Sequence, residues 1–354
     1  MKKLICKLML FIIPVLIYLG VSVFIDPYNV FHTDNIRMTY MTPNQNFIKT
    51  RYILDNKDKF NALLFGSSRV ANLPVDGLPS VSEDGKELSW YNMTYAMGGI
   101  EENYLTLKTL IDGGVDVDEV IIMIDEISMW KNASYEYDEL IFITYQAFEK
   151  SPFKFYYAYL KQKPLLKILP LIYDNYRGKE ECLLGKKLFY EYGVDEKNTD
   201  FGVEEGIPTV YESERSLEYN EMSNAVSYLE KIVTLCDEEG IRLYVVTTPI
   251  YEATYREAID NGYLEFLEDA AQVTDFYLFS GLNTYTISGN YYFDGSHFRP
   301  YVGLQMEKVV FGTDEERKKA VVEAANINSK VSFGQIVSKD NIDDIIDKLR
   351  EEVE

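Results

Sequence analysis

The sequence predicts an α/β protein built on a parallel sheet. Five short apolar runs recur along the chain, each bounded by Gly, Pro, Asp or Asn. Runs of this length suit strands that are buried on both faces, and patterns typical of amphipathic helices lie between them. Because strands alternate with helices, we expect a parallel sheet with helices on both faces. An apolar fraction of 47% is enough for a substantial core and excludes a disordered chain.

The predicted strands lie on both sides of a long interruption. They are residues 61–65 (NALLF), 88–92 (LSWYN), 119–124 (EVIIMI), 241–247 (IRLYVVT) and 273–279 (VTDFYLF). Apolar residues at helical spacing predict helices over 101–111 and 222–236, and Gly113 and Gly240 stand where these helices should end. The alternation stops between about 130 and 215, a stretch rich in Tyr, Phe and Lys that we interpret as a mostly helical insertion.

These patterns predict three parts in the chain. Residues 26–312 are expected to form the α/β domain with its insertion. Residues 313–354 are strongly charged and are expected to be a C-terminal extension that ends in a helix over 341–353, with its charges on a solvated face. Residues 1–25 precede the domain and have a different composition.

The N-terminal part predicts a membrane anchor. Residues 4–24 (LICKLMLFIIPVLIYLGVSVF) form an apolar run, and about 20 such residues suffice to cross a bilayer. Three lysines precede or open the run and Asp26 closes it, so the positive-inside rule places the N-terminus in the cytoplasm and the rest outside the cell. A cleaved signal peptide is the alternative, but the run is long for one and no A-x-A-like site follows it. We therefore expect a single-pass protein of the cell membrane.

The composition excludes several classes of function. The chain has 57 acidic and 35 basic side chains and a net charge of −22, which argues against nucleic-acid binding. With two histidines, His32 and His297, and no zinc-type cysteine motif, neither a metal nor another cofactor is expected. Cys182 and Cys236 either pair outside the cell or are two unrelated buried thiols. If catalysis requires an imidazole, only the two histidines can supply it.

Residues that could carry chemistry follow the predicted strands, where open parallel sheets form their sites. A GSSR segment at 66–69 leaves the first strand, and a DGSHFR segment at 294–299 stands near the end of the domain. A serine can act as a nucleophile if an imidazole takes its proton and a carboxylate orients that imidazole. Asp294 and His297 are three residues apart, so the carboxylate can reach one ring nitrogen while the other faces outward. Each segment is common by itself, and the combination predicts a serine nucleophile.

This arrangement resembles the SGNH (GDSL-like) hydrolase superfamily. In that superfamily a G-D-S block follows the first strand, a Gly block follows the second, an Asn block follows the third, and a D-x-x-H segment closes the domain. Residues 66–68 of this chain match the first block with Ser in place of Asp. The resemblance implies a flavodoxin-like three-layer sandwich with a five-stranded parallel sheet. It also implies Ser68 as the nucleophile, His297 as its base and Asp294 as the residue that orients His297. The backbone of Ser68 and of Gly98, or of the adjacent glycine, would form the oxyanion hole.

Two features near these blocks are open to more than one interpretation. In the third block, Asp125 or Glu126 stands where Asn is expected, and an ionised carboxylate cannot donate a hydrogen bond. One oxyanion donor is therefore missing or is supplied elsewhere. Arg69 and Arg299 flank the serine and histidine blocks and are candidates for binding an anionic group of the substrate. The alternative is that they pair with nearby acids such as Asp125 or Glu126.

Within the superfamily, the layout is similar to membrane-anchored bacterial members with one N-terminal helix. They carry a D-P-Y-N segment after that helix, here residues 26–29, and a G-S-S-R serine block. The D-alanyl-transfer protein of lipoteichoic acid assembly and the alginate O-acetylation proteins share this layout loosely. The resemblance implies acyl transfer to or from a cell-envelope polysaccharide or teichoic-acid-like polymer, beside a membrane-bound O-acyltransferase. The alternatives are a plain carbohydrate deacetylase and a non-catalytic accessory subunit of such an acyltransferase.

Overall fold

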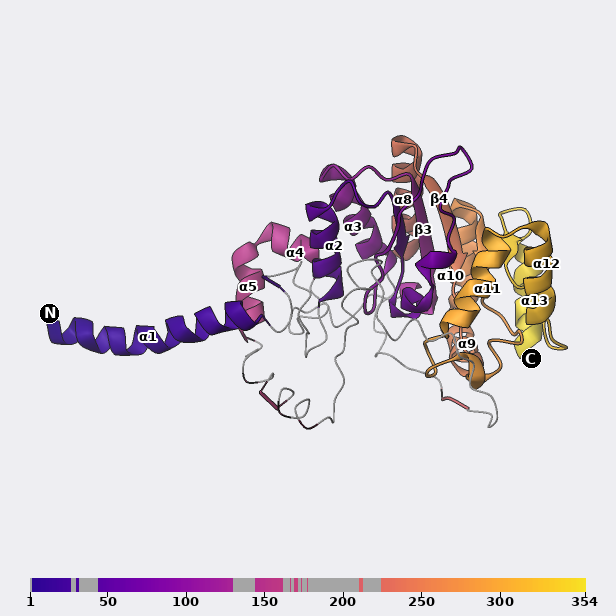
Figure 1. Ribbon diagram of the computed structural model, residues 1–354. Coiled ribbons are helices and arrows are strands. Elements are labelled where there is room, and N and C mark those ends of the chain that lie inside the picture. Colours follow the sequence, from indigo (N-terminus) through magenta and orange to yellow (C-terminus); the bar gives the residue numbers. More distant parts are fainter. Residues whose placement is uncertain are drawn as a thin grey trace.

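The computed structural model describes residues 2–26, 30–31, 44–129, 144–161, 166, 169–170, 173, 177, 210–212 and 224–354. A central sheet lies between two layers of helices, and a separate N-terminal helix projects from one end (Figure 1). The fold is therefore of the α/β class with a three-layer arrangement, as the sequence predicts.

The sheet has six strands in the order β2-β1-β3-β4-β5-β6. The strands are β1 (Ala62–Phe65), β2 (Trp90–Asn92), β3 (Glu119–Ile124), β4 (Arg242–Thr247), β5 (Phe276–Leu278) and β6 (Gln335–Val337). The first five are parallel, and their order 2-1-3-4-5 is flavodoxin-like. β1 and β3 are buried along their whole length, which explains why they are continuously apolar in sequence. All five predicted strands are present.

The sixth strand corrects the prediction of a five-stranded, all-parallel sheet. β6 pairs antiparallel with β5, with Val337 opposite Phe276. Residues 313–354 therefore contribute a strand to the sheet of the α/β domain. They form α12 (Asp314–Ala324), β6 and α13 (Ile342–Val353). The charges of α13 occupy one side of the helix, while Ile345, Ile346 and Leu349 are buried in the main core.

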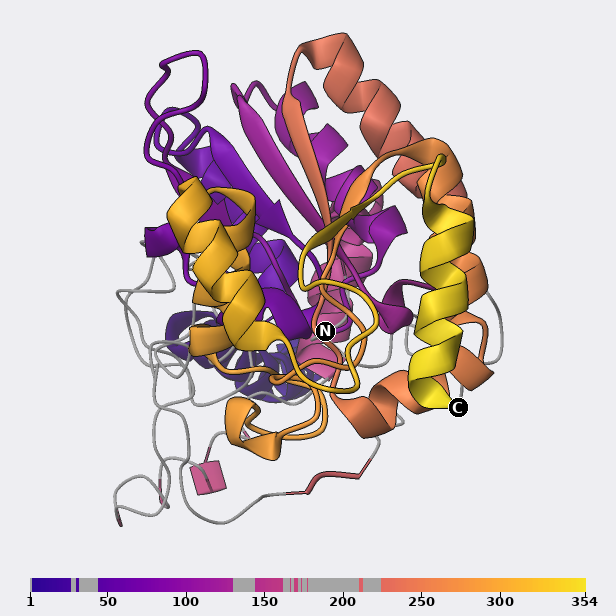
Figure 2. The ribbon, with the colours of Figure 1, turned by 90° about the vertical axis from the view of Figure 1, so that its right-hand side faces the viewer.

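Helices cover the two faces of the sheet unequally, as Figure 2 shows. One face carries α2 (Gln45–Asp55), α3 (Ile100–Asp112), α8 (Ala225–Glu239), α9 (Glu252–Asp260), α10 (Tyr263–Val273) and α13. The other carries the 3-10 helices η1 (Ser68–Asn72) and η2 (Val75–Gly77), together with α11 (Pro300–Val310) and α12. Further 3-10 turns, η3 (Glu126–Met129) and η7 (Gly289–Tyr291), follow β3 and precede α11. The helices predicted over 101–111 and 222–236 are α3 and α8, and Gly240 ends α8 in the left-handed conformation.

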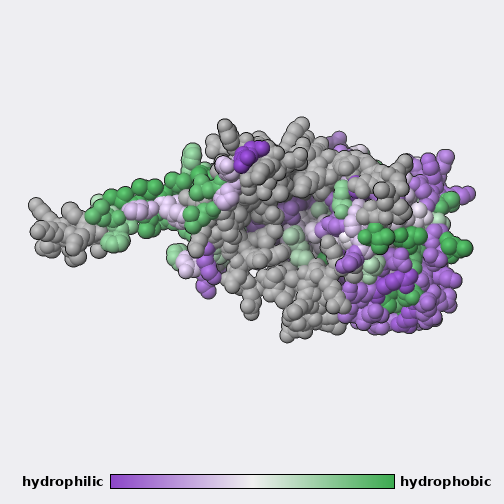
Figure 3. Space-filling model, turned by 90° about the horizontal axis from the view of Figure 1, so that it is seen from below, coloured by the Kyte–Doolittle hydropathy of each residue, from purple (hydrophilic) through white to green (hydrophobic). Residues whose placement is uncertain are grey.

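The N-terminal helix α1 (Lys2–Ile25) projects away from the sheet (Figure 1). Its side chains are described from Met9 onward, and apolar side chains cover its surface (Figure 3). Among the described residues, no helix reaches the length and apolar character required of a membrane span. Two further helices, α4 (Tyr145–Lys150) and α5 (Pro152–Lys161), are the helical part of the predicted insertion that the structure describes in full. They pack with α2 in a small aromatic cluster.

Candidate active site

Ser68 stands at the carboxyl end of β1, on the turn that starts η1. Gly66 leaves the strand with a positive φ, and a Cβ there would lie 2.8 Å from the Val70 side chain. This tight turn ends the strand and brings the serine out at the edge of the sheet. Ser68 is half-buried, whereas Ser67 and Arg69 on either side of it are buried. Of the two adjacent serines, Ser68 is therefore the one that a substrate can reach.

Asp294 and His297 lie on a tight hairpin before α11. The Phe293 amide donates to the His297 carbonyl at 2.8 Å, and Tyr292 and Phe298 form an antiparallel bridge. The Asp294 carboxylate closes the loop, because its Oδ1 accepts the amides of Ser296 (2.9 Å) and His297 (2.8 Å). One carboxylate thus shapes the loop and faces the imidazole at the same time.

The three predicted side chains form one hydrogen-bonded chain. His297 Nε2 lies 3.1 Å from Ser68 Oγ, and His297 Nδ1 lies 2.9 Å from both carboxylate oxygens of Asp294. Because Nδ1 faces a carboxylate, we assign the ring proton to Nδ1. Nε2 then accepts a hydrogen bond from the serine hydroxyl. Burial alone would raise the pKa of Asp294, but hydrogen bonds from the His297 ring and from the two loop amides outweigh burial and hold it below its usual value. Asp294 is therefore ionised at neutral pH, as the orienting carboxylate must be.

Two long-range hydrogen bonds fix the histidine loop, one to the serine segment and one to α9, and neither could be predicted from the sequence. Asn72, on η1, donates its side-chain amide to the carbonyl of Phe298 at 2.8 Å, across 226 residues of sequence. Thr254 on α9 donates its hydroxyl to the Gly295 carbonyl at 2.9 Å. Both bonds end on backbone atoms next to the catalytic candidates, and no motif marks an asparagine or threonine for such a role.

The acidic third block binds the serine turn. Ser67 donates its hydroxyl to Asp125 at 2.5 Å, while the other oxygen of that carboxylate accepts the amide and hydroxyl of Ser128 at 3.0 Å. Arg69 forms an ion pair with Glu126. The residues on either side of Ser68 are therefore fixed to two consecutive carboxylates after β3. Asp125 and Glu126 therefore position the serine turn, whereas the resemblance implies an Asn that donates a hydrogen bond at this place.

Burial governs the charge state of the ion pair between Arg69 and Glu126. Arg69 is 0% exposed, and Glu126 is buried beside it. Desolvation raises the pKa of Glu126 to about 7, although the positive charge of Arg69 acts in the opposite direction. Glu126 therefore changes its charge near neutral pH while in contact with the segment that carries the nucleophile.

The two arginines that were candidates for substrate binding are directed into the fold. Arg69 pairs with Glu126, which is the local alternative that the sequence left open. Arg299 is 5% exposed; its Nε donates to the carbonyl of Tyr292 at 3.2 Å, and its guanidinium lies 4.5 Å from the centre of the Phe293 ring. A prediction from sequence cannot distinguish an arginine that faces a substrate from one that is buried in the fold. Burial and these local contacts favour a structural role for both residues.

Gly98 packs directly against the serine turn. A Cβ at Gly98 would lie 2.5 Å from the carbonyl oxygen of Gly66, so only glycine fits. The Gly98 amide donates to the Tyr95 carbonyl at 3.1 Å, and a role in an oxyanion hole would require this turn to open. The Ser68 amide, by contrast, has no acceptor in the part of the chain that the structure describes. Asn92, at the end of β2, accepts the Thr94 amide at 3.0 Å and so shapes the segment that leads to Gly98.

The close approach of Gly98 to Gly66 yields a direct prediction. Gly98→Ala is expected to displace the turn before Ser68 and to lower the free energy of unfolding by about 1–3 kcal/mol, the usual effect of overpacking. Because the displaced carbonyl precedes the nucleophile by two residues, the reactivity of Ser68 should fall as well. Urea unfolding and serine labelling of the same samples measure the two effects. Gly85→Ala is the control for the labelling rate, because a Cβ there meets no atom within 4 Å and the change affects stability only through the strain of its positive φ.

Several predicted features lie outside the described residues. These are His32, Cys182, residues 27–29 of the D-P-Y-N segment and most of the insertion at 130–215. Cys236 is described and is a buried free thiol, whose pKa burial raises to about 12. It is a core residue of α8 and not a reactive group.

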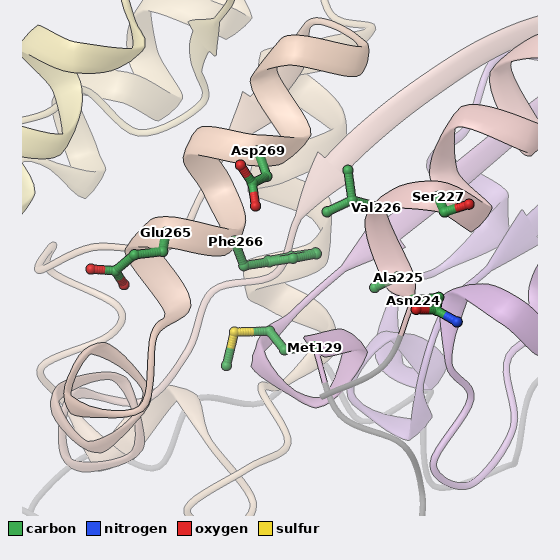
Figure 4. Close-up of a pocket in the computed structure, with 8 residues that line it drawn as sticks. All are labelled: Met129, Asn224, Ala225, Val226, Ser227, Glu265, Phe266 and Asp269. Carbon is green, nitrogen blue, oxygen red and sulfur yellow. The ribbon is translucent and has the colours of Figure 1, made fainter. Parts of the chain in front are cut away.

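A pocket of about 320 Å³ lies beside η3, between the N-terminal parts of α8 and α10 (Figure 4). Its lining is apolar at the centre, where Met129 and Phe266 lie side by side, and acidic at Glu265 and Asp269. Ser68, Asp294 and His297 are not among the residues that line it. The pocket is therefore separate from the hydrogen-bonded chain of the candidate site.

No protein-family model matches this chain, and no curated protein matches it in sequence. The geometry of Ser68, His297 and Asp294 therefore carries the functional argument. The resemblance to the SGNH superfamily remains an interpretation of the motifs.

Proposed function

We propose that the protein is a serine acyltransferase or esterase that acts on O-acyl groups of a cell-envelope glycopolymer. The observation that supports this proposal most directly is the chain of hydrogen bonds from Ser68 through His297 to Asp294. A partly exposed serine, an imidazole with its free nitrogen toward that serine and an ionised carboxylate behind the imidazole are the groups that acyl transfer requires.

The proposed reaction has two steps on the same serine. In the first, His297 Nε2 takes the proton from Ser68 Oγ as the oxygen attacks the acyl carbonyl. It then gives the proton to the donor's ester oxygen, which leaves as a hydroxyl when its bond to the acyl carbon breaks. The product is an acyl ester on Ser68. In the second, His297 takes a proton from water or from a sugar hydroxyl as the oxygen of that acceptor attacks the ester carbonyl. The bond to Ser68 Oγ then breaks, His297 gives the proton to Oγ, and the acyl group leaves on the acceptor oxygen. Asp294 stabilises the imidazolium in both steps, and the Ser68 amide is a donor for the developing oxyanion.

The place of action is part of the proposal. The lysines at the start of the apolar helix α1 favour a cytoplasmic N-terminus, with the α/β domain outside the cell. There, α1 would serve as a single membrane anchor. A membrane-bound O-acyltransferase that delivers acyl groups across the bilayer is the partner that such a layout suits. The polymer would be a polysaccharide or a teichoic-acid-like chain.

One observation favours a second candidate, a non-catalytic accessory subunit of such an acyltransferase. The block after β3 presents Asp125 and Glu126, both engaged with the serine turn, and the Gly98 amide is already used by Tyr95. A site with a single oxyanion donor would be a weak esterase, because each donor contributes substantially to the rate. A carbohydrate deacetylase would use the same residues as the main proposal and differ only in taking water as the acceptor.

Labelling of the full chain with a fluorophosphonate tests whether the site is a serine nucleophile. We expect wild type to be labelled and Ser68→Ala to lose the label, because the phosphonate forms a bond to the activated oxygen. Ser67→Ala is the matched control, since it removes the neighbouring hydroxyl that is bonded to Asp125. It should still be labelled, at a reduced rate.

The outcome separates the candidates. A label that persists in Ser68→Ala, or that disappears only in Ser67→Ala, contradicts the assignment, and a wild-type chain that is never labelled favours the accessory subunit. With a labelled chain, an acetyl or alanyl ester donor then distinguishes the two enzyme proposals. An esterase releases the acyl group into water, whereas a transferase moves it to an added glycan.

A further inference from the structure

The solvent-facing side of α5 carries exposed aromatic residues next to lysines. Phe153 and Tyr157 lie one helical turn apart and are 82% and 64% exposed. Lys161 follows one turn further, and Lys154 lies beside Phe153; both are exposed. We call these four residues the α5 stripe. Aromatic residues edged by lysines on one side of a helix are typical of the membrane–water interface, where the rings enter the headgroup region and the amines reach the phosphates.

The opposite side of α5 prevents the helix from turning its aromatic residues inward. Phe155 and Tyr159 are buried, and the Phe155 ring stacks on Phe47 of α2 with ring centres 4.5 Å apart. Since α2 also packs against the main core, α5 is held in one orientation relative to the sheet. The exposure of Phe153 and Tyr157 is therefore a fixed property of the fold.

The same helix is joined to the base of α1. The Tyr159 hydroxyl donates to the Asp26 carboxylate at 3.2 Å, and that carboxylate also accepts the amides of Val30 (3.0 Å) and Phe31 (2.7 Å). The Phe31 ring stacks on Tyr156 of α5 with centres 4.8 Å apart. Figure 1 shows α5 at the end of the globular part from which α1 projects. A bilayer that surrounds α1 would consequently meet α5 first.

We propose that the α5 stripe lies in the headgroup region of the lipid bilayer that α1 crosses. The exposed apolar surface of α1 continues to its last turn at Phe24 and Ile25, and α5 is joined to the residues that follow this turn through Asp26 and Phe31. The lysines of the stripe supply local positive charge in a chain of net charge −22, which otherwise repels anionic headgroups. The globular part is thus held against the membrane at two places. This inference rests on the proposed function in one respect, namely that α1 is a membrane anchor.

Tryptophan fluorescence of the full chain in vesicles of phosphatidylcholine and phosphatidylglycerol tests the proposal. Phe153→Trp places a probe in the stripe. Val322→Trp is the matched control, because Val322 is 67% exposed and lies on α12, at the end of the molecule far from α1 (Figure 1). After subtraction of the wild-type emission, lipids brominated near the headgroup should quench the Phe153→Trp probe at least about threefold more than the control probe. Acrylamide, which is dissolved in the water, should quench the control probe more strongly than the Phe153→Trp probe.

Flotation of the same vesicles in a density gradient, after a high-salt wash, reports the anchor separately. Chains that float while both probes remain equally open to acrylamide overturn the α5 proposal and leave the anchor intact. Chains that do not float overturn both. If the Phe153→Trp probe is shielded in native membranes but open in pure lipid vesicles, a membrane protein and not lipid covers the stripe, and the proposal is wrong.

Discussion

Replacing His297 by alanine is expected to lower the rate of Ser68 acylation by about 10⁴- to 10⁶-fold, the range seen when the imidazole of a serine triad is removed. His297 Nε2 is the group within hydrogen-bond distance of Ser68 Oγ, so no other described residue replaces it as the base. Asp294→Asn should lower the rate by about 10⁴-fold, because an amide facing Nδ1 stabilises the wrong tautomer of the ring. The first-order rate of fluorophosphonate labelling measures both variants on one scale.

The chain offers a matched control for this experiment. His32 is the only other histidine in the sequence, and His32→Ala should leave the labelling rate unchanged. Far-UV circular dichroism and urea unfolding verify that the variants are folded. A His297→Ala protein that is labelled within about tenfold of the wild-type rate would show that the imidazole does no proton transfer. The assignment of His297 as the base would then be wrong.

The strands and the three catalytic candidates could be predicted because their signals are local. A strand buried on both faces must be apolar at every position, as Val120 to Ile124 show, and such a run is visible without any knowledge of its neighbours. Asp294 and His297 are close in sequence, and Ser68 follows a strand whose place in a parallel sheet is set by the alternation of elements. The carboxyl ends of these strands then lie at one edge by topology alone.

The features that were missed depend on contacts between distant segments. Strand β6 lies in the strongly charged segment 313–354 and lacks the longer apolar run that marks β2 and β5 in the sequence. It joins the sheet only because the chain returns to β5. Asn72 and Phe298 are far apart in sequence, so nothing in either segment indicates their hydrogen bond. Arg69 has the same sequence context whether it binds substrate or pairs with Glu126. Only the direction of its side chain decides between these roles, and tertiary packing sets that direction.

Glu126→Gln is expected to make the protein more stable above pH 7. The pKa of Glu126 is raised from 4.5 to about 7 in the folded protein. Between these values the folded state keeps a proton that the unfolded chain has released, so the contribution of this group to stability falls as the pH rises through the window. A shift of this size corresponds to about 3 kcal/mol, since one pKa unit is worth about 1.4 kcal/mol. Glutamine imitates the neutral acid and should remove this loss.

The measurement is the difference in unfolding free energy between variant and wild type across a range of pH. It should be close to zero at pH 4 and grow to about 3 kcal/mol in favour of the variant at pH 8. Other buried acids titrate in both proteins and cancel in the difference. Glu230→Gln, on the exposed surface of α8, is the matched control and should show no such trend. A variant that is less stable than wild type at pH 8 would mean that the ion pair with Arg69 outweighs the burial of Glu126.

The position of Ser68 suggests why a pair with this expected cost above pH 7 would be kept. Arg69 follows the nucleophile, and Glu126 holds Arg69 to the turn after β3, while Asp125 holds Ser67 on the other side. Glutamine keeps an acceptor for the guanidinium but loses the charge that draws it in, so η1 should become looser. We therefore expect Glu126→Gln to be labelled about 10-fold more slowly than wild type at pH 8, where it is the more stable protein. Stability and reactivity would then change in opposite directions, which a merely structural role of the ion pair does not produce.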